Sequence, residues 1–208
     1  MKYSIQSIFI GKPQTFISKQ GKEIHTAFRK NPVEQNIFLG KLNFEGDLQA
    51  DLEHHGGPDK AVCVYPFDHY SYWEKVYGRS FSLGAFGENI TVQHLTENEV
   101  SIGDVFSLGE AVVQVVQPRQ PCYKIAASHG LRDFPDKIVK TGYSGYYLRV
   151  LQEGLVSAHD SLVLKEKGSV TVANVNRLLY HEKKDTHLLQ MVLDEPALAE
   201  GLRKSLMK

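Results

Sequence analysis

The apolar positions of this chain fall mostly in short runs between Tyr3 and about Leu164. Gly, Pro, Asn and Asp bound these runs, which is typical of β-strands. One run, Ala61–Tyr65, is apolar throughout and is typical of a fully buried strand. The other expected strands are Ser4–Ile10, Glu23–Arg29, Asn36–Leu39, Glu88–Val92, Val105–Leu108, Val112–Gln117, Tyr146–Val150 and Leu162–Leu164. Many short strands with few helical patterns between them predict a mainly β fold, a barrel or a sandwich, rather than alternating βαβ units.

Helical patterns are rare in this β region and frequent after it. Pro66–Tyr77 is an expected helix because proline is favoured in a first turn and Gly78 follows its end. Tyr123–Ser128 is a second expected helix, with Gly130 as its stop. After Lys167 three stretches have apolar residues at helical spacing: Thr171–Tyr180, Asp185–Leu193 and Ala197–Met207. Helices this short are marginal alone, so we expect a small three-helix bundle and two domains, residues 1–167 and 168–208.

Composition narrows the class of protein. The chain has 208 residues, and its 24 Lys and Arg residues balance its 24 Asp and Glu residues. The chain lacks the excess of positive charge that would indicate a nucleic-acid partner. It also has no apolar run long enough for a signal peptide or a membrane span. The two cysteines form no CxxC pair, so neither a disulfide framework nor a structural zinc site is expected. These features predict a cytoplasmic protein with reduced thiols and leave its oligomeric state open.

Cys122 is the strongest candidate for chemistry. It follows Pro118, Arg119 and Pro121 in the stretch VVQVVQPRQPCYK and precedes Lys124. The prolines stiffen the loop. The two cations, with the positive end of a helix that begins after Cys122, favour a thiolate, which is the form that acts as a nucleophile or a metal ligand. From these residues alone, a packed loop cysteine with solvated neighbours is an equally good interpretation.

Three other stretches carry candidate ligand-binding residues. HHGGPDK has two glycines that let a backbone approach a ligand, and a lysine that supplies charge. GAFGENI offers Glu88 and Asn89, and AFRKNP places Arg29 and Lys30 at a strand end. Glycine turns and solvated surface charges explain these stretches at least as well. Cys63, in the middle of an apolar run, is interpreted as a core residue.

Together HHGGPDKAV, AFGENI, QPRQPCYK and GYYLRVLQEGLVSAHD, in this order, resemble a MOSC domain, the module named after the C-terminal part of molybdenum-cofactor sulfurase. The resemblance covers essentially the whole chain and is strongest to the YiiM-like branch, which carries a three-helix C-terminal domain. It implies a MOSC-type β-barrel with a few short helices, followed by that bundle. It also implies a molybdenum cofactor, molybdopterin with bound molybdenum, and makes Cys122 the metal ligand and catalytic residue. By motif and charge, the candidate cofactor-binding residues are Arg29, Lys30, His55, Gly56, Gly57, Lys60, Asn89, Arg119 and Lys124.

The resemblance further implies an oxidoreductase that reduces N-hydroxylated compounds, such as hydroxylaminopurines, to amines with electrons from a flavoprotein reductase. Three other hypotheses remain open. In the first, Cys122 carries sulfur as a persulfide without molybdenum. In the second, the protein binds or delivers the cofactor without reductive turnover. In the third, Cys122 is a nucleophile with His55 or His129 as its base.

Overall fold

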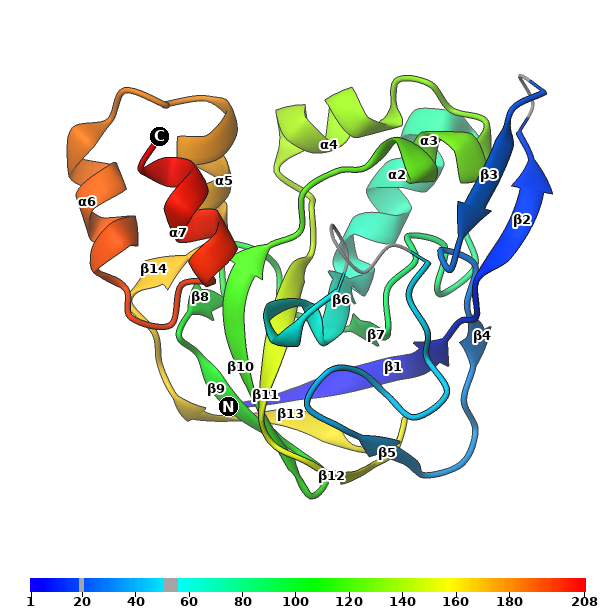
Figure 1. Cartoon of the computed structure of the whole chain (residues 1–208), viewed down its shortest axis with the longest axis horizontal. Helices are drawn as coiled ribbons and strands as arrows, with labels where there is room; N and C mark the ends of the chain where they lie inside the picture. Colours follow the sequence, from blue (N-terminus) through cyan, green and yellow to red (C-terminus); the bar gives the residue numbers. More distant parts are fainter. Residues whose placement is uncertain (19–20, 51–55) are drawn as a thin grey trace.

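A computed structural model of the chain describes residues 1–18, 21–50 and 56–208. The centre of this described part is a closed barrel of seven strands (Figure 1). Neighbouring strands are antiparallel except β6 and β7, which are parallel. The ring closes because the last strand pairs with the first, in the order β13 (Ser161–Glu166), β9 (Val105–Leu108), β10 (Ala111–Pro118), β11 (Tyr146–Gln152), β6 (Val62–Pro66), β7 (Ile90–Val92) and β1 (Lys2–Ile10). The prediction of a mainly β barrel is confirmed.

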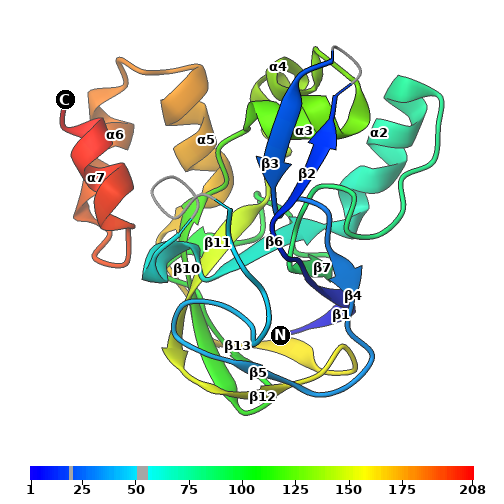
Figure 2. The same ribbon diagram turned by 45° about the vertical axis from the view of Figure 1, so that its right-hand side comes forward.

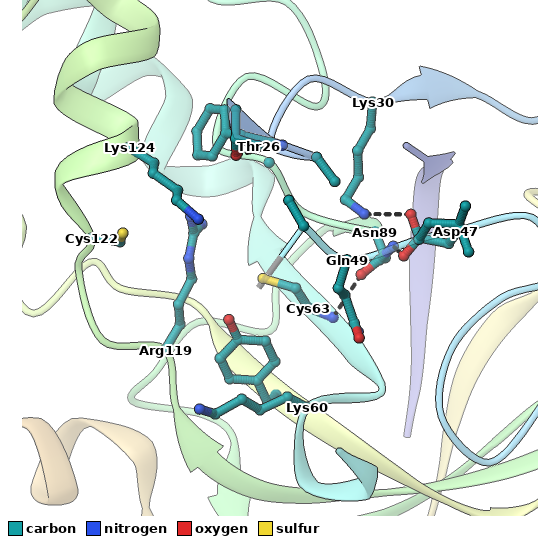
Figure 3. A pocket seen from close by; sticks show the side chains of 16 residues that line it. Thr26, Lys30, Asp47, Gln49, Lys60, Cys63, Asn89, Arg119, Cys122 and Lys124 are labelled. Atoms are coloured by element: carbon teal, nitrogen blue, oxygen red, sulfur yellow. Dashed lines mark hydrogen bonds and ion pairs between the residues drawn. The ribbon is translucent and has the colours of Figure 1, made fainter. Parts of the chain in front are cut away.

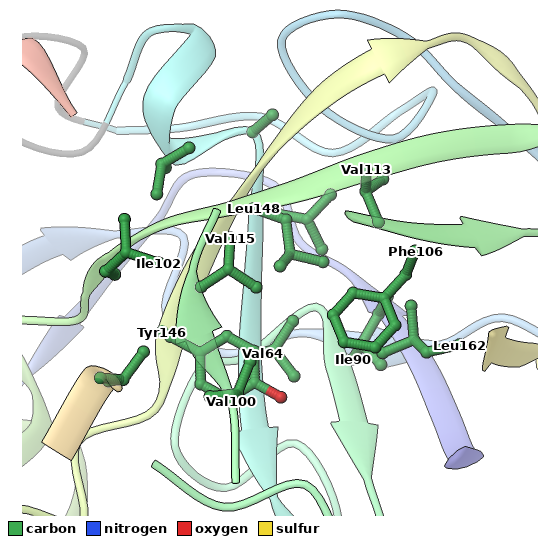
Figure 4. Close-up of a cluster of buried hydrophobic side chains, with 14 of the residues drawn as sticks. Val64, Ile90, Val100, Ile102, Phe106, Val113, Val115, Tyr146, Leu148 and Leu162 are labelled. Carbon is green, nitrogen blue, oxygen red and sulfur yellow. The ribbon is translucent and has the colours of Figure 1, made fainter. Parts of the chain in front are cut away.

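Alternating side chains build the interior of the barrel. In β10, Val113 and Val115 are fully buried, whereas Val112 and Gln114, which alternate with them, are half-buried. Inward side chains of β10 meet those of the neighbouring strands in one hydrophobic cluster (Figure 4). Strand β6 is buried along its whole length, as its uninterrupted apolar run predicts, and its Tyr65 packs in a second hydrophobic cluster with side chains of the covering helices.

Four small pairings extend the barrel. They join β2 (Gln14–Ile17) to β3 (Glu23–Thr26), β5 (Ile37–Leu39) to β12 (Gly154–Val156), β8 (Ser101–Ile102) to β14 (Val170–Thr171), and β4 (Asn31–Pro32) to the end of β1. The sequence pattern did not predict β2, β4, β8, β12 or β14, which hold only two to four residues each. Two predicted strands are shorter than expected, since β3 ends at Thr26 and β7 begins at Ile90.

Three helices cover one side of the barrel. They are α2 (Tyr70–Tyr77), which follows the short 3-10 helix η2 (Phe67–His69), α3 (Tyr123–His129) and α4 (Phe134–Thr141). Aromatic side chains join them to the barrel: the Tyr65 ring stacks on Phe86, and the Trp73 indole donates a hydrogen bond to the Tyr65 hydroxyl at 2.6 Å. Helix α4 was not predicted, although Pro135 in its first turn and Gly142 after its end are start and stop signals.

The predicted three-helix tail is present on the other side of β10 (Figure 2). It consists of α5 (Val172–Tyr180), α6 (Thr186–Asp194) and α7 (Glu200–Leu206). Thr171 and Asp185 cap α5 and α6 by accepting hydrogen bonds from backbone N–H groups in the first turn. Val175 and Leu202 belong to the same hydrophobic cluster as the barrel interior, so the tail shares the core of the barrel. The domain boundary between residues 167 and 168 stays a prediction, and no helix in the described residues has the length and apolar character needed to cross a bilayer.

Candidate functional site

Cys122 lies where two cavities meet. One, here called the narrow pocket, has a volume of about 90 Å³ and enters the barrel wall between β6, β11 and the segment after β10. The other, here called the wide cleft, has a volume of about 810 Å³ and extends from Cys122 to helix α7. Four side chains line both cavities: Lys60, Cys122, Lys124 and Tyr147. A ligand that fills both cavities would therefore pass directly over the Cys122 sulfur.

The segment that carries Cys122 is fixed at both ends. Pro118 ends β10 opposite Tyr146 of β11, and the Arg119 N–H donates to the Gly145 carbonyl at 3.0 Å. Cys122 has an extended backbone and is the N-cap residue of α3, with its carbonyl accepting from the Ile125 N–H at 3.1 Å. The sequence prediction of a helix beginning directly after Cys122 is confirmed. The segment therefore holds the half-buried thiol at one place on the cavity wall.

Cations surround the narrow pocket (Figure 3). Arg119, Lys124 and Lys60 all line it. Burial lowers the pKa of Arg119, but the neighbouring Cys63, Tyr147, Glu88 and Tyr65 together raise it, so the pKa lies above its ordinary value and the side chain stays charged. Lys30 also lines the pocket, with its ammonium 2.6 Å from the Asp47 carboxylate. Asp47 pairs with Lys30, and Arg119, Lys60 and Lys124 bring three further cationic side chains to the pocket. Such side chains suit an anionic group such as a phosphate.

Asn89 and Glu88 hold the framework of the site. The Asn89 side-chain oxygen accepts from the Cys63 N–H at 3.1 Å, and its amide donates to the Phe9 carbonyl and to Asp47. The buried Glu88 carboxylate accepts from the Phe86 N–H at 3.0 Å and from the Thr91 hydroxyl at 2.9 Å. Asn89 lines the narrow pocket, as predicted for a ligand-binding residue, but its polar atoms serve the protein. Its clear role is to shape the pocket.

Cys63 and Tyr147 are lining residues that the sequence did not indicate. Cys63 is buried, as predicted, but its sulfur also faces the narrow pocket on the side of Arg119 (Figure 3). Burial raises the pKa of this thiol, and Arg119 opposes only part of that effect. Tyr147 pairs with Cys63 across β11 and β6, and burial, then Cys63, raise the pKa of its hydroxyl. Both groups therefore keep their protons at neutral pH.

The remaining predicted residues are distributed over three places. Gly56 and Gly57 line the wide cleft, and Gly57, with φ 91°, precedes the 3-10 helix η1 (Pro58–Lys60) that presents Lys60. Arg29 lines a third cavity, and its guanidinium lies 4.4 Å from the centre of the Phe16 ring. His55 lies outside the described residues. As cofactor ligands, Arg29 and His55 stay predictions, and Arg29 does not line the narrow pocket.

His129 lies at the far end of α3 from Cys122, about 10 Å along a helix of this length. Its ring nitrogen Nε2 lies 2.6 Å from the Ala85 carbonyl, and the side chain lines the third cavity. Burial lowers the pKa of His129, and Arg79 and Arg29 lower it further. This placement argues against His129 as the base for a Cys122 nucleophile.

Comparisons with known proteins agree with this fold. The MOSC domain model matches residues 51–163, and the model of the YiiM-like, 3-alpha helix domain matches residues 170–208. The uncharacterized protein YflK of Bacillus subtilis is 50% identical over 100% of this chain and 94% of its own length. A protein of Gibberella moniliformis named Reductase is 30% identical over 81% of this chain, which spans only 31% of that protein. The crystal structure of YiiM from Geobacillus stearothermophilus matches 99% of this chain and 97% of its own chain, with a TM-score of 0.84 and a sequence identity of 40%. The chain therefore belongs to the MOSC domain family, in the branch that carries the YiiM-like 3-alpha helix domain.

Proposed function

We propose that this protein is a molybdenum-cofactor-dependent oxidoreductase that reduces N-hydroxylated compounds, such as hydroxylaminopurines, to amines. The observation that carries the proposal is the position of Cys122, the cysteine that lines both the cationic narrow pocket and the wide cleft. The relative named Reductase supports an oxidoreductase. A flavoprotein reductase as the electron donor is part of the proposal.

The residues present fit a molybdopterin cofactor. Cys122 offers one soft sulfur ligand, which suits a metal already bound to the dithiolene sulfurs of the pterin. Arg119, Lys124 and Lys60 supply the positive charge that its phosphate needs. In residues 1–18, 21–50 and 56–208, no three His, Cys, Asp or Glu side chains are grouped so that they would hold a metal ion by themselves.

The reaction requires two electrons and two protons, since R–NHOH becomes R–NH₂ and water. When bound, the cofactor supplies the two-electron chemistry that breaks the N–O bond. The chain would supply position: as a ligand, Cys122 would hold the reactive centre where the two cavities meet, beside the wide cleft that would admit the substrate. Tyr147 lines both cavities and keeps its proton, so its hydroxyl is a neutral hydrogen-bond donor for the N-bound oxygen of the substrate.

Replacement of Cys122 tests this proposal. We expect Cys122→Ser to fold like the wild type but to lose both bound molybdenum and the reduction of an N-hydroxylated base, because a serine hydroxyl is a poor ligand for a soft metal. Molybdenum and pterin should be quantified in both proteins after expression in a host that makes the cofactor, with circular dichroism as the check of folding. Cys63→Ser is the matched control, since it removes the other thiol of the narrow pocket.

The same experiment separates the alternatives. Equal molybdenum in Cys122→Ser and in the wild type would contradict the ligand role. A persulfide on Cys122 in a wild-type protein without molybdenum would support a sulfur carrier. Bound molybdenum without turnover, using an artificial electron donor, would support a module that only binds or delivers the cofactor.

A further inference from the structure

We infer that helix α7 forms the substrate-facing wall of the wide cleft and that Gly201 determines how large a substrate can be that reaches Cys122. The inference rests on the proposed function and assigns the three-helix tail a part in it. The wide cleft is lined from the barrel side by Cys122, Tyr123 and Tyr147, and from the tail side by Gly201, Leu202 and Ser205. Figure 1 shows α3 and α7 on either side of the upper end of β10.

The wall is held firmly against the barrel. The Ala199 N–H donates to the Val116 carbonyl of β10 at 3.0 Å, and the Glu200 N–H donates to Asp59 Oδ2 at 3.2 Å. Asp59 is itself fixed, because its Oδ1 lies 2.6 Å from the Arg149 guanidinium of β11. Leu202, at 4% exposed, anchors α7 in the shared core. The first turn of α7 therefore cannot move away from the cleft without breaking contacts with β10 and with Asp59 of η1.

Gly201 has no structural reason to be a glycine. It lies in the first turn of α7, its backbone does not need a positive φ, and a Cβ atom built there meets nothing within 4 Å. Glycine in a helix is less favourable than any other residue except proline. Neither the backbone nor the packing requires this glycine, and its consequence is open space at a position that lines the wide cleft.

The size and lining of the cleft indicate the class of substrate. A volume of about 810 Å³ lies in the range of sites that hold molecules of nucleoside size, and it far exceeds what hydroxylamine needs. Tyr123, at 59% exposed, offers an aromatic ring beside Cys122 for a planar heterocycle. The wall of α7 therefore selects N-hydroxylated compounds that carry a ring and a further large group.

Turnover of two substrates of different size tests the wall. The cofactor-loaded proteins to compare are the wild type, Gly201→Ala, Gly201→Phe and the control Met191→Phe, which adds the same ring at an exposed position on α6. We expect Gly201→Phe to lower kcat/KM for an N-hydroxylated nucleoside by about tenfold relative to hydroxylamine. Gly201→Ala should have a smaller effect in the same direction, and Met191→Phe should leave the ratio unchanged.

The outcomes distinguish the wall from the reaction. An unchanged ratio in Gly201→Phe overturns the role of α7 and leaves the reductase intact. A wild type that reduces neither substrate overturns the proposed function, and the wall is then tested without the cofactor. In that test, Cys122 of the cofactor-free protein is alkylated with iodoacetamide or with the bulky fluorescein maleimide, and the modified peptide is quantified by mass spectrometry.

The alkylation test has its own expected result. Gly201→Phe should slow the bulky maleimide at Cys122 by about tenfold and iodoacetamide much less, because only the larger reagent fills the cleft. Met191→Phe should change neither rate. Equal maleimide rates in the wild type and Gly201→Phe overturn the inference, and Gly201→Leu replaces Gly201→Phe if circular dichroism shows that the phenylalanine variant does not fold.

Discussion

Asp47 is the residue that joins the segments around the narrow pocket. Its carboxylate, 2% exposed, accepts from the Gly11 N–H at 2.7 Å, from the Lys30 ammonium at 2.6 Å and from the Asn89 amide at 2.8 Å. These three donors come from separate parts of the chain. A buried carboxylate needs such donors, because burial of an uncompensated charge is costly. Asp47 thus orders the pocket wall and neutralises one of its lysines.

We predict that Asp47→Ala lowers the free energy of unfolding by about 3–5 kcal/mol, because it leaves the buried Lys30 ammonium without its counter-charge. Urea unfolding followed by circular dichroism measures this change. Lys204→Ala is the control, since its ion pair with Glu200 is exposed and its removal should change the free energy by less than about 1 kcal/mol. A loss in Asp47→Ala no larger than in the control would contradict the role of Asp47.

The connection between the barrel and the tail depends on one glycine. Gly168 lies just before β14, which pairs with β8, and its N–H donates to the Asp104 carboxylate at 2.7 Å. A Cβ atom at this position would overlap the Ile102 carbonyl oxygen. The close approach of two backbones, rather than a special φ, therefore requires glycine here.

Gly168→Ala and Gly201→Ala form a matched pair of substitutions with opposite expected effects. We predict that Gly168→Ala lowers the free energy of unfolding by about 1–3 kcal/mol, because the backbone of β8 must shift to make room. Gly201→Ala should raise it by up to about 1 kcal/mol, because alanine favours the helix and the new methyl group meets no atom. Chemical denaturation of both variants measures the difference, and changes of the same sign would contradict the account of one glycine or the other.

At the scale of the whole molecule, several buried titratable groups stay neutral in the folded protein. Burial raises the pKa of the Cys63 thiol and of the Tyr65 and Tyr146 hydroxyls, with Glu97 contributing second for the two tyrosines. The unfolded chain has ordinary values, near 9.0 for cysteine and 10.0 for tyrosine. Because the folded pKa is higher, the folded protein binds more protons than the unfolded chain at alkaline pH. This contribution to stability is complete below the unfolded pKa and is lost as pH rises toward the folded one.

We predict that the free energy of unfolding is steady near neutral pH and falls above about pH 9, by about 1.4 kcal/mol per pH unit for each group that lies between its two pKa values. The urea midpoint measured from about pH 8 to about pH 11 tests this. Cys63→Ala should remove the earliest part of the fall, because the thiol has the lowest unfolded pKa of the three. A midpoint that rises over this interval would contradict the prediction.

The fold could be predicted wherever its signal is local. Val105–Leu108 and the start of the helix after Cys122 agree with the structure because alternation, capping and glycine stops act within a few residues. Strands such as β8 and β14 escaped prediction because each holds only two residues and exists only by pairing with the other. Glu88 and Asn89 were expected in a strand, but their side chains hold a turn and the pocket wall before β7 begins.

The sequence by itself determined the mainly β fold, the three-helix tail and the motif around Cys122, because the signal for each lies within a few consecutive residues. Only the tertiary structure decided that Cys63 and Tyr147 line the same pocket as Cys122, that Arg29 lies on another cavity, and that α7 lines the wide cleft. The physical reason is that either face of a strand can turn toward the core, and a short helix can pack in many orientations. The choice among them is made by packing between residues far apart in the chain.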